Sequence, residues 1–383
     1  MKTRSPIRTI FLLGFILTLH TALPVYVYSS FLSKISSERF VGLIYAVSSL
    51  LTIAAILTLP YWLRRFGNYR LALVVLSAEL ISLVALFFFK EPTLIVVSFA
   101  LNFVLVAVLG INLDIFLERF STDGKTGGLR GGFLTTINAA WLIVPVTVGL
   151  IVADANYTKP IFIAALLALP TLVMLRKLKG FSDPTYHDFP IKKTFFEVSS
   201  DKNLKAIFIA SFLLQFFYSW MVIYTPLYLH GHLGLSWQNI GVIFTVMLLP
   251  FVLLERPAGL VADRRLGEKE LLMVGFAVMA LATAAVGAYG GRSVAVWALL
   301  LFLSRVGASL VEVMGDTYFF KKVAANRANV ISLFRATRPL AMTAAPAAAT
   351  VILSAATIES IFFVLAALLM LGLAAGATLK DTK

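Results

Sequence analysis

Twelve long apolar segments set the strongest limit on how this chain can fold. They cover residues 7–31, 40–63, 70–89, 93–118, 130–152, 159–176, 204–229, 237–257, 269–290, 294–320, 328–354 and 358–379. A helix of about 20 apolar residues is long enough to cross the hydrocarbon core of a bilayer. Charged residues make up only 14% of the chain, whereas a soluble domain carries about 25%. The sequence therefore predicts an all-α polytopic membrane protein with twelve transmembrane helices.

The basic residues are distributed unevenly between the two sides of the predicted membrane. An even number of spans places both termini on one side, and that side holds 27 of the 33 Lys and Arg residues. The other side holds five, and Arg305 lies within a span. By the positive-inside rule the termini are cytoplasmic, so we expect a multi-pass protein of the cytoplasmic (plasma) membrane. The net charge of +14 then reflects topology and contact with anionic lipid headgroups, and no nucleic acid partner is expected.

Four landmarks recur at a nearly constant offset and indicate an internal repeat. Each repeat holds six spans, an even number, so both repeats enter the membrane in the same direction and are parallel repeats. We expect an N-terminal six-helix half (1–176), a cytoplasmic linker (177–203) and a C-terminal six-helix half (204–383). The linker is compatible with an amphipathic helix on the inner leaflet and equally with a plain flexible connection. The matched landmarks are Pro24 and Pro226, Gly67 and Gly267, Asp114 and Asp316, and Pro145 and Pro346, with offsets of 202, 200, 202 and 201 residues.

The turn after the eighth span carries a motif. It reads Gly259-Leu-Val-Ala-Asp263-Arg264-Arg265-Leu-Gly267-Glu-Lys269. This resembles the G-x-x-x-D-R-x-G-R-K signature of the major facilitator superfamily, with one extra residue before the second glycine. Twelve spans in two halves and a basic central loop are also similar to that superfamily, so the resemblance covers the whole chain. It implies the superfamily's fold and the movement of a small solute by alternating access.

The same turn is predicted to act as a gating motif. Gly259 permits close helix packing, and Asp263 offers a carboxylate to the positive N-terminus of a neighbouring helix. Either Arg264 or Arg265 can pair with a carboxylate such as Asp316. Together with Gly267, these residues would latch the two halves on the cytoplasmic side. An ordinary solvated charged turn is the alternative.

The matching turn of the first half departs from the motif. Proline (Pro60) stands at the first glycine position, and arginine (Arg64) stands at the aspartate position. That turn cannot work through the same carboxylate, so we expect an arginine there to pair with Asp114 or Glu118 instead. The glycine and proline signature of antiporters is also incomplete in the fifth span, which has Pro145 without the paired glycines.

Three ionisable residues form one stripe along the tenth span. Arg305, Glu312 and Asp316 are separated by seven and four residues, which places them within about 20° of one line on a helix. A charge at the bilayer centre costs roughly 2.5 to 3.5 kcal/mol. We predict that Arg305 binds an anionic or strongly polar substrate group, and that Glu312 and Asp316 belong to a proton-coupling set. A purely structural ion-pair network is the alternative.

Further polar residues within the spans complete the predicted sites. Glu79 and His20 are proton-coupling candidates, His20 because imidazole titrates near neutrality. For both, a structural hydrogen bond inside the helix bundle is the alternative. The resemblance also implies which helices line a central cavity, and it thereby nominates substrate-binding side chains. These are Asn102, Asn138, Trp141, Gln215, Tyr218 and Tyr224.

A secondary transporter coupled to a proton gradient is the function that these features favour, with an efflux antiporter for drugs or metabolites as an alternative. A polytopic membrane enzyme normally needs a reaction centre of paired carboxylates or a metal. The outer loops are short, and no H-E-x-x-H or G-x-S-x-G motif is present. A transporter-like sensor is a third possibility. We therefore expect no enzymatic activity.

The expected partners follow from the same interpretation. They are a small-molecule substrate, a coupling ion that we take to be H⁺, and membrane lipids. The absence of cysteine removes thiolate chemistry and Cys-type metal sites, so neither a cofactor nor a metal is expected. The protein is expected to act as a monomer.

Cysteine labelling tests the predicted orientation. A cysteine placed at Lys159 should react with an impermeant maleimide added to intact cells, whereas one placed at Lys193 should not, because the distribution of basic residues puts them on opposite sides. The natural chain has no cysteine, so the label has no background target. Labelling at position 193 alone would invert the orientation.

Overall fold

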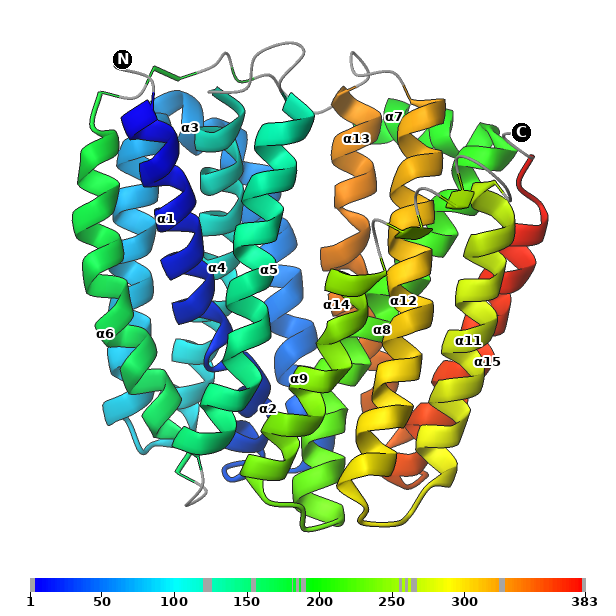
Figure 1. Cartoon of the computed structure of the whole chain (residues 1–383). Helices are drawn as coiled ribbons and strands as arrows, with labels where there is room; N and C mark the ends of the chain where they lie inside the picture. The colour runs from blue at the N-terminus through cyan, green and yellow to red at the C-terminus, as the bar shows by residue number, and fades with distance from the viewer. Residues whose placement is uncertain are drawn as a thin grey trace. The chain divides into compact units, whose positions relative to one another are not determined.

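The computed structural model describes most of the chain. The described residues are 4–119, 126–152, 156–180, 182–183, 186, 191–254, 257–258, 261–262, 267–323 and 328–380. Within these residues every regular element is helical (Figure 1). Eight helices of the described chain are long and apolar enough to cross a membrane, and two shorter apolar helices accompany them.

The helices group into two compact units. Unit 1 comprises residues 1–37 and 47–188, and unit 2 comprises residues 38–46 and 189–383. The division falls inside one long helix, because the segment 38–46 belongs to the second unit while the rest of that helix belongs to the first.

Unit 1 is a bundle in which the first helix is packed against later ones. α1 contacts α5 and α6 along its length and α4 more locally. α1 stops just before Pro24, and α2 continues the same span beyond it, because proline lacks the N–H that the helical ladder needs. The elements are α1 (Arg4–Ala22), α2 (Val25–Ser33), α3 (Glu38–Phe88), α4 (Pro92–Arg119), α5 (Thr126–Ile151), α6 (Thr158–Leu175) and the short 3₁₀ helix η1 (Arg176–Leu178).

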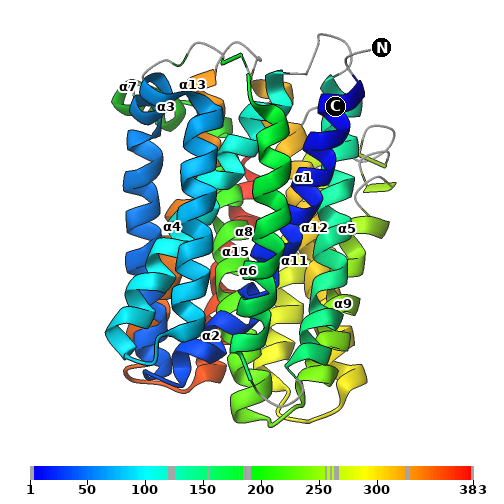
Figure 2. The same ribbon diagram turned by 90° about the vertical axis from the view of Figure 1, so that its left-hand side faces the viewer.

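α3 contains two membrane-crossing helices joined at Gly67. A straight helix of 51 residues would be about 77 Å long, more than twice the hydrocarbon thickness of about 30 Å. The backbone at Gly67 leaves the helical conformation, with φ 74° and ψ 161°, which glycine adopts without steric cost. The chain turns back there, as Figure 2 shows beside the α3 label. The two spans predicted on either side of this residue are therefore confirmed.

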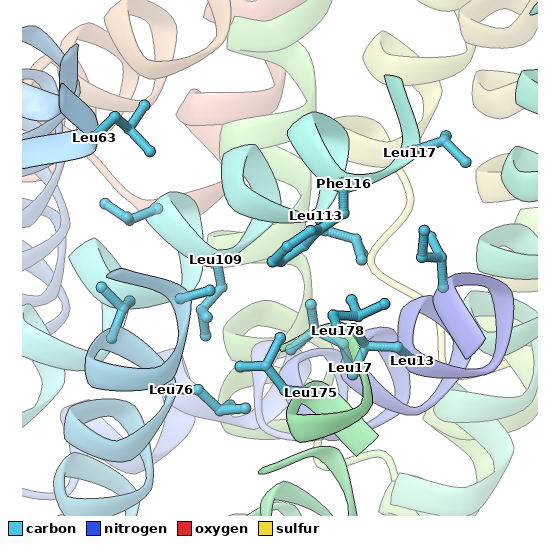
Figure 3. Close-up of a cluster of buried hydrophobic side chains, with 14 of the residues drawn as sticks. Leu13, Leu17, Leu63, Leu76, Leu109, Leu113, Phe116, Leu117, Leu175 and Leu178 are labelled. Carbon is cyan, nitrogen blue, oxygen red and sulfur yellow. The ribbon is translucent and has the colours of Figure 1, made fainter. Parts of the chain in front are cut away.

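Leucine side chains from several helices form an apolar core in unit 1. Leu13 and Leu17 of α1 meet Leu109 and Leu113 of α4, and Leu175 at the end of α6 closes the cluster (Figure 3). All five are nearly fully buried. Because lipid is as apolar as leucine, this cluster holds the helices together through close packing more than through a hydrophobic driving force.

Unit 2 is built around α12. This helix packs against α8, α9 and α11, and α11 packs in turn against α15. The elements are α7 (Ile191–Ser200), α8 (Lys202–Pro226), the π-helix η2 (Leu227–His232), α9 (Trp237–Leu253), α11 (Glu268–Ala288), α12 (Val294–Lys322), α13 (Ala328–Arg335), α14 (Thr337–Ile352) and α15 (Ile358–Ala377).

The described chain contains twelve membrane-crossing helices when α3 is divided at its kink. In this count α1 with α2, α8 with η2, and α13 with α14 each form one crossing. The predicted all-α fold with twelve crossings in two parallel six-helix repeats is confirmed. Gly67 and Gly267 both begin a crossing with positive φ, 74° and 86° respectively, so the matched turns share one backbone conformation.

The outer faces of both bundles are apolar. Ile81 of α3 is 67% exposed, and Leu281 of α11 is 74% exposed. A water-soluble protein does not expose a surface rich in such residues. These side chains are suited to contact with lipid acyl chains.

The segment predicted as a linker contains the helix α7, which has two distinct faces. Thr194 and Val198, one turn apart, are buried, and α7 packs against α13. Phe195 and Phe196 are 65% and 73% exposed. The amphipathic helix is therefore present, and its exposed face carries two aromatic rings.

α11 and α12 approach each other closely at a pair of glycines. A Cβ atom at Gly307 would lie 2.5 Å from the carbonyl oxygen of Gly275, and one at Gly275 would lie 2.9 Å from the carbonyl oxygen of Gly307. Small residues allow such backbone approach between membrane helices. This contact fixes the position of α12.

Replacing Gly307 with alanine should destabilise the protein, because the added methyl group forces the two backbones apart. Gly110→Ala is the matched control, since a Cβ at Gly110 meets no atom within 4 Å and alanine is favoured in a helix by about 1 kcal/mol. Thermal unfolding in detergent should give a lower midpoint for Gly307→Ala only. Equal losses in both variants would contradict the role of this contact.

Candidate functional site

The predicted stripe of Arg305, Glu312 and Asp316 lies on α12, facing other helices of unit 2. Arg305 is only 3% exposed, and Glu312 and Asp316 are partly buried. All three come from one continuous helix, so the spacing in the sequence carries over directly into the structure. The aromatic, hydrogen-bond and ion-pair contacts described below come from α8 and α13.

Aromatic rings of α8 cover the guanidinium of Arg305. Its central carbon lies 4.7 Å from the ring centre of Phe217 and 5.7 Å from that of Tyr218. A cation above an aromatic face is attracted by the ring quadrupole, most strongly where water is excluded. The N–H groups of a guanidinium project within its own plane, which is the geometry that binds carboxylate or phosphate in a bidentate manner. The site is therefore suited to a planar oxyanion.

Tyr218 also contacts the second member of the stripe. Its hydroxyl group donates a 2.6 Å hydrogen bond to Oε2 of Glu312. The ring of one tyrosine therefore faces the buried arginine while its hydroxyl binds the carboxylate. The sequence nominates Tyr218 as a substrate-binding residue, and the structure places it between Arg305 and Glu312.

Asp316 pairs with an arginine that the sequence analysis did not name. Nη1 of Arg335 on α13 lies 3.6 Å from its Oδ2 atom, with the two side chains 57% and 43% exposed. An exposed pair of this kind contributes about 0 to 1 kcal/mol. Arg264 and Arg265, the partners suggested by the sequence, lie outside the described residues.

Gln215 and Tyr224, the other two predicted substrate-binding residues of α8, lie on different faces of the helix. Gln215 is half-buried and lies three residues before Tyr218, on the same face of the helix. Tyr224 is fully buried, and its position six residues later places it about 120° around the helix from Tyr218. A Cβ at Gly42 would lie 2.5 Å from the hydroxyl oxygen of Tyr224, so Tyr224 packs against the segment 38–46 of unit 2.

Three predicted residues meet in unit 1. Nε2 of His20 lies 3.3 Å from Oε2 of Glu79, and Nδ2 of Asn102 donates a 3.2 Å hydrogen bond to Oε1 of the same carboxylate. All three side chains are buried. Two proton-coupling candidates and one substrate-binding candidate therefore form a single cluster, a connection that the sequence did not reveal.

The nominated residues of α5 are both half-buried. The ring of Trp141 packs edge-on against Tyr26, with ring centres 6.2 Å apart. Asn138 lies three residues earlier on the same helix. Their assignment to substrate binding stays a prediction.

Most of the predicted gating motif lies outside the described residues. This holds for Gly259, Asp263, Arg264 and Arg265. Gly267 is described and begins α11 with a positive φ of 86°. The next residue, Glu268, is 1% exposed and forms an ion pair with Lys321 near the end of α12. Sequence reasoning missed this pair, which ties the start of α11 to α12.

A residue overlooked in the sequence completes the matching turn of unit 1. Oδ1 of Asp183 accepts a 2.7 Å hydrogen bond from the backbone N–H of Asn68, the residue that follows Gly67. A Cβ at Gly67 would lie 2.5 Å from the other carboxylate oxygen. The carboxylate therefore caps the start of a helix, where the helix dipole favours negative charge. The turn that lacks the motif's aspartate receives a carboxylate from the segment after α6.

Two further contacts surround this cap. The side chains of Asn68 and Asn112 are joined by a 2.7 Å hydrogen bond, and Asn68 donates a second one of 3.0 Å to the carbonyl oxygen of Asn112. Tyr186 donates a 2.6 Å hydrogen bond to Asp183. Burial, followed by this hydrogen bond, raises the pKa of Tyr186 above its usual value. The only sequence signal for Asp183 is an acidic residue after a basic run, which is too weak to assign a role.

Among the described residues, no group of three or more His, Cys, Asp or Glu side chains is placed to hold a metal ion. In the stripe on α12 and in the cluster in unit 1, each carboxylate is instead contacted by cationic or neutral donors. Such groups can bind an organic anion or exchange a proton.

Replacing Asp183 with alanine should expose the N–H of Asn68 and lower the free energy of unfolding by about 0.5 to 2 kcal/mol, as for other helix caps. Hydrogen exchange measured by mass spectrometry should accelerate in the peptide that contains Asn68. The start of α8, where Asp201 accepts from the N–H groups of Asn203 and Leu204, is the internal control and should exchange as before. Unchanged exchange at Asn68 would show that the cap does not form.

Solved structures of several transporters share this fold over nearly the full chain. A mutant of the nucleoside transporter NupG has a TM-score of 0.76 at 14% identity, covering 98% of this chain and 99% of that one. A bacterial homologue of the iron transporter ferroportin, in its inward-facing state, has a TM-score of 0.75 at 15% identity, covering 97% and 98%. A POT family transporter in complex with 5-aminolevulinic acid has a TM-score of 0.79 at 12% identity, covering 96% and 94%.

Sequence comparisons give the family. No curated protein sequence matches the chain significantly. The family model of the Major Facilitator Superfamily matches residues 10–254 and, in a second alignment, residues 207–382. These alignments together cover both units, and they confirm the resemblance found in the turn after the eighth span. The chain belongs to the Major Facilitator Superfamily.

Proposed function

We propose that the chain is a secondary active transporter that moves a small anionic or strongly polar solute across the membrane by alternating access, coupled to a proton gradient. The observation that carries this function is the contact of Tyr218 with both Arg305 and Glu312. A substrate-binding cation and a proton-binding carboxylate then share one neutral residue. Binding of the solute to Arg305 therefore alters the contact of Tyr218 with Glu312, and binding of a proton to Glu312 alters its contact with Arg305.

Arg305 supplies the substrate contact. Its guanidinium is buried among aromatic rings, and a buried cation gains most from a partner that brings an opposite charge. A carboxylate or phosphate group of the solute fits the bidentate geometry that arginine favours. Gln215, on the same face of α8 as Tyr218, is placed to donate to or accept from a polar part of the solute.

Glu312 supplies the proton site. When it is ionised it accepts the hydrogen bond of Tyr218, and when it is protonated it carries no charge to be moved through the bilayer. Three charged side chains act electrostatically on this carboxylate. They are Asp316, one turn further along α12, Arg335 and Arg338. The release of the proton therefore responds to charges near the end of the helix.

The halves 1–176 and 204–383, joined by the linker 177–203, are the moving parts in this function. Rocking of two repeats around a central site is the general mechanism of transporters built from repeats. Gly259, Asp263, Arg264, Arg265 and Gly267 act as the cytoplasmic latch. The protein acts as a monomer in the cytoplasmic membrane, with lipids as its surroundings and both termini in the cytoplasm.

The structures with similar folds carry names of nucleoside, peptide and metal transporters, and identities of 12 to 17% leave the solute open. The buried arginine favours an anionic solute over a metal cation. A thermal-shift screen of the purified protein against organic anions identifies the solute first, since a ligand of the folded state raises its apparent stability.

Removing the charge of Arg305 should weaken solute binding. With Arg305→Gln, the affinity should fall by the roughly 1.5 to 3 kcal/mol of a charge-assisted hydrogen bond, measured by isothermal titration calorimetry with a solute from the screen. Arg305→Lys is the matched control, because it keeps the charge but loses the planar fork, and it should bind with intermediate affinity. Full affinity in Arg305→Gln would place the solute elsewhere.

Glu312→Gln should separate binding from coupling. Glutamine resembles the protonated carboxyl group, so the variant should bind the solute and exchange it in counterflow, but it should lose accumulation driven by a pH gradient in proteoliposomes. Its solute affinity should also become independent of pH. Tyr218→Phe is the companion variant, since it removes the hydrogen bond to Glu312 and keeps the ring over Arg305, and it should shift the pH dependence without abolishing binding. Accumulation by Glu312→Gln would show that another group carries the proton.

A further inference from the structure

A second buried acid and base lie far from α12 in the sequence, at the centre of unit 1. His20 of α1 is 0% exposed and Glu79 of α3 is 1% exposed. His20 is near the middle of the span Ile7–Ser33, and Glu79 is near the middle of the helix that runs from Asn68 to Phe88. Ionisable residues at such depth are costly and are generally functional.

A chain of hydrogen bonds determines the state of the carboxylate. The hydroxyl of Tyr28 donates a 2.9 Å hydrogen bond to Oδ1 of Asn102, which leaves the amide nitrogen of Asn102 as a donor. That nitrogen donates to Oε1 of Glu79 at 3.2 Å and to Oγ of Ser82 at 3.1 Å, and the Ser82 hydroxyl donates to the backbone oxygen of Glu79 at 2.6 Å. A carboxylate that receives a donor at one oxygen is stabilised in its charged form.

The remaining oxygen of Glu79 faces the imidazole. Oε2 lies 3.3 Å from Nε2 of His20, so Nε2 carries a hydrogen when the carboxylate is ionised. The other ring nitrogen, Nδ1, is buried and has no hydrogen-bond partner among the described residues. A neutral imidazole with hydrogen on Nε2 has its lone pair on Nδ1. The cluster therefore contains a charged acid, an oriented base and a vacant position for one proton.

Other titratable groups on the surrounding elements lie mainly toward helix ends. Among the described residues, hydrogen bonds link one further titratable side chain to His20 and Glu79. It is Tyr28 of α2, which donates to Asn102, and Asn102 in turn donates to Glu79. α5 and α6 contain no acidic residue and no histidine. At about 1.5 Å per residue, Arg8 and Asp114 are about 18 Å along their helices from His20 and Asn102 respectively. The remaining charged residues of these elements, by their place in the sequence, are Arg4, Glu38, Arg39, Arg64, Arg65, Arg70, Glu118, Arg119, Arg130 and Lys159.

We propose that His20 and Glu79 form one proton-binding site at the centre of unit 1, held in position by Asn102. Binding of one proton converts a pair with a net charge of −1 into a neutral imidazolium and carboxylate pair. In a medium without water, that change removes an unpaired charge from the interior. Asn102 is a positioning residue that aims a donor at the carboxylate.

This site does not depend on solute transport or on Glu312. It lies directly beside the interruption of the first span, where α1 ends at Ala22 and α2 begins at Val25. A change of charge at His20 therefore occurs two residues from the end of α1. The site provides unit 1 with its own response to pH.

Nuclear magnetic resonance of the imidazole nitrogens tests the site without any solute. The full chain is labelled with ¹⁵N in its four histidines, held in lipid nanodiscs and titrated from about pH 4.5 to 9, the range that brackets an ordinary histidine. His20→Gln identifies the signals of His20 by their loss. We expect Nδ1 of His20 to change from the unprotonated to the protonated form within this range while Nε2 stays protonated.

Two variants with opposite effects make the result specific. Glu79→Gln removes the negative partner and should weaken proton binding at His20 by at least about tenfold, as expected for the loss of an adjacent opposite charge. Asn102→Leu removes a donor that stabilises the carboxylate and should strengthen proton binding instead. Glu91→Gln, which alters an exposed carboxylate at the start of α4, should leave the titration unchanged.

The outcomes are distinct from those of the transport assays. A His20 signal that keeps one protonation state across the range would overturn the site, and so would a titration that Glu79→Gln does not move. If Glu79→Gln does not fold, an unchanged titration in Asn102→Leu would have the same meaning. Because no solute is present in the titration, a negative result does not bear on the roles of Arg305 and Glu312. Negative results with the Arg305 and Glu312 variants likewise do not bear on the His20 titration.

Discussion

A polar group inside the hydrocarbon has to find its partner within the protein, because no water is available to replace one. This requirement explains the arrangement of both buried clusters. In unit 2, Tyr218 covers the guanidinium of Arg305 and donates to Glu312. In unit 1, Asn102 donates to the carboxylate of Glu79. In each case a neutral side chain from a neighbouring helix donates a hydrogen bond to a carboxylate within the helix bundle.

The same requirement made the fold predictable from the sequence. A span is recognised by its length and apolar composition, and both are properties of a continuous segment. The turns at Gly67 and Gly267 were also recognisable, since they are separated by 200 residues and need a backbone that glycine adopts readily. The division of residues between the compact units was less accessible. The segment 38–46 belongs to unit 2, although its sequence does not distinguish it from the rest of α3.

The sites were predictable only as far as one helix extends. Arg305, Glu312 and Asp316 were assigned to a stripe because helical periodicity relates residues along a single helix. Contacts between helices join residues that are far apart in the sequence. His20 and Glu79 are separated by 59 residues, and Tyr218 and Glu312 by 94. No local pattern encodes these pairings, so residues named separately from the sequence proved to be neighbours.

The cap at Asn68 has a consequence for the order in which unit 1 is made. Asp183 follows Asn68 by 115 residues, and a ribosome synthesises the chain from its N-terminus. The second arm of α3 is therefore complete, with its first N–H group uncapped, while α4, α5 and α6 are still being inserted. The cap can form only after the sixth span has emerged. A nascent chain that ends just before residue 183 contains all six helices of the first half but not the contact that completes the turn at Gly67.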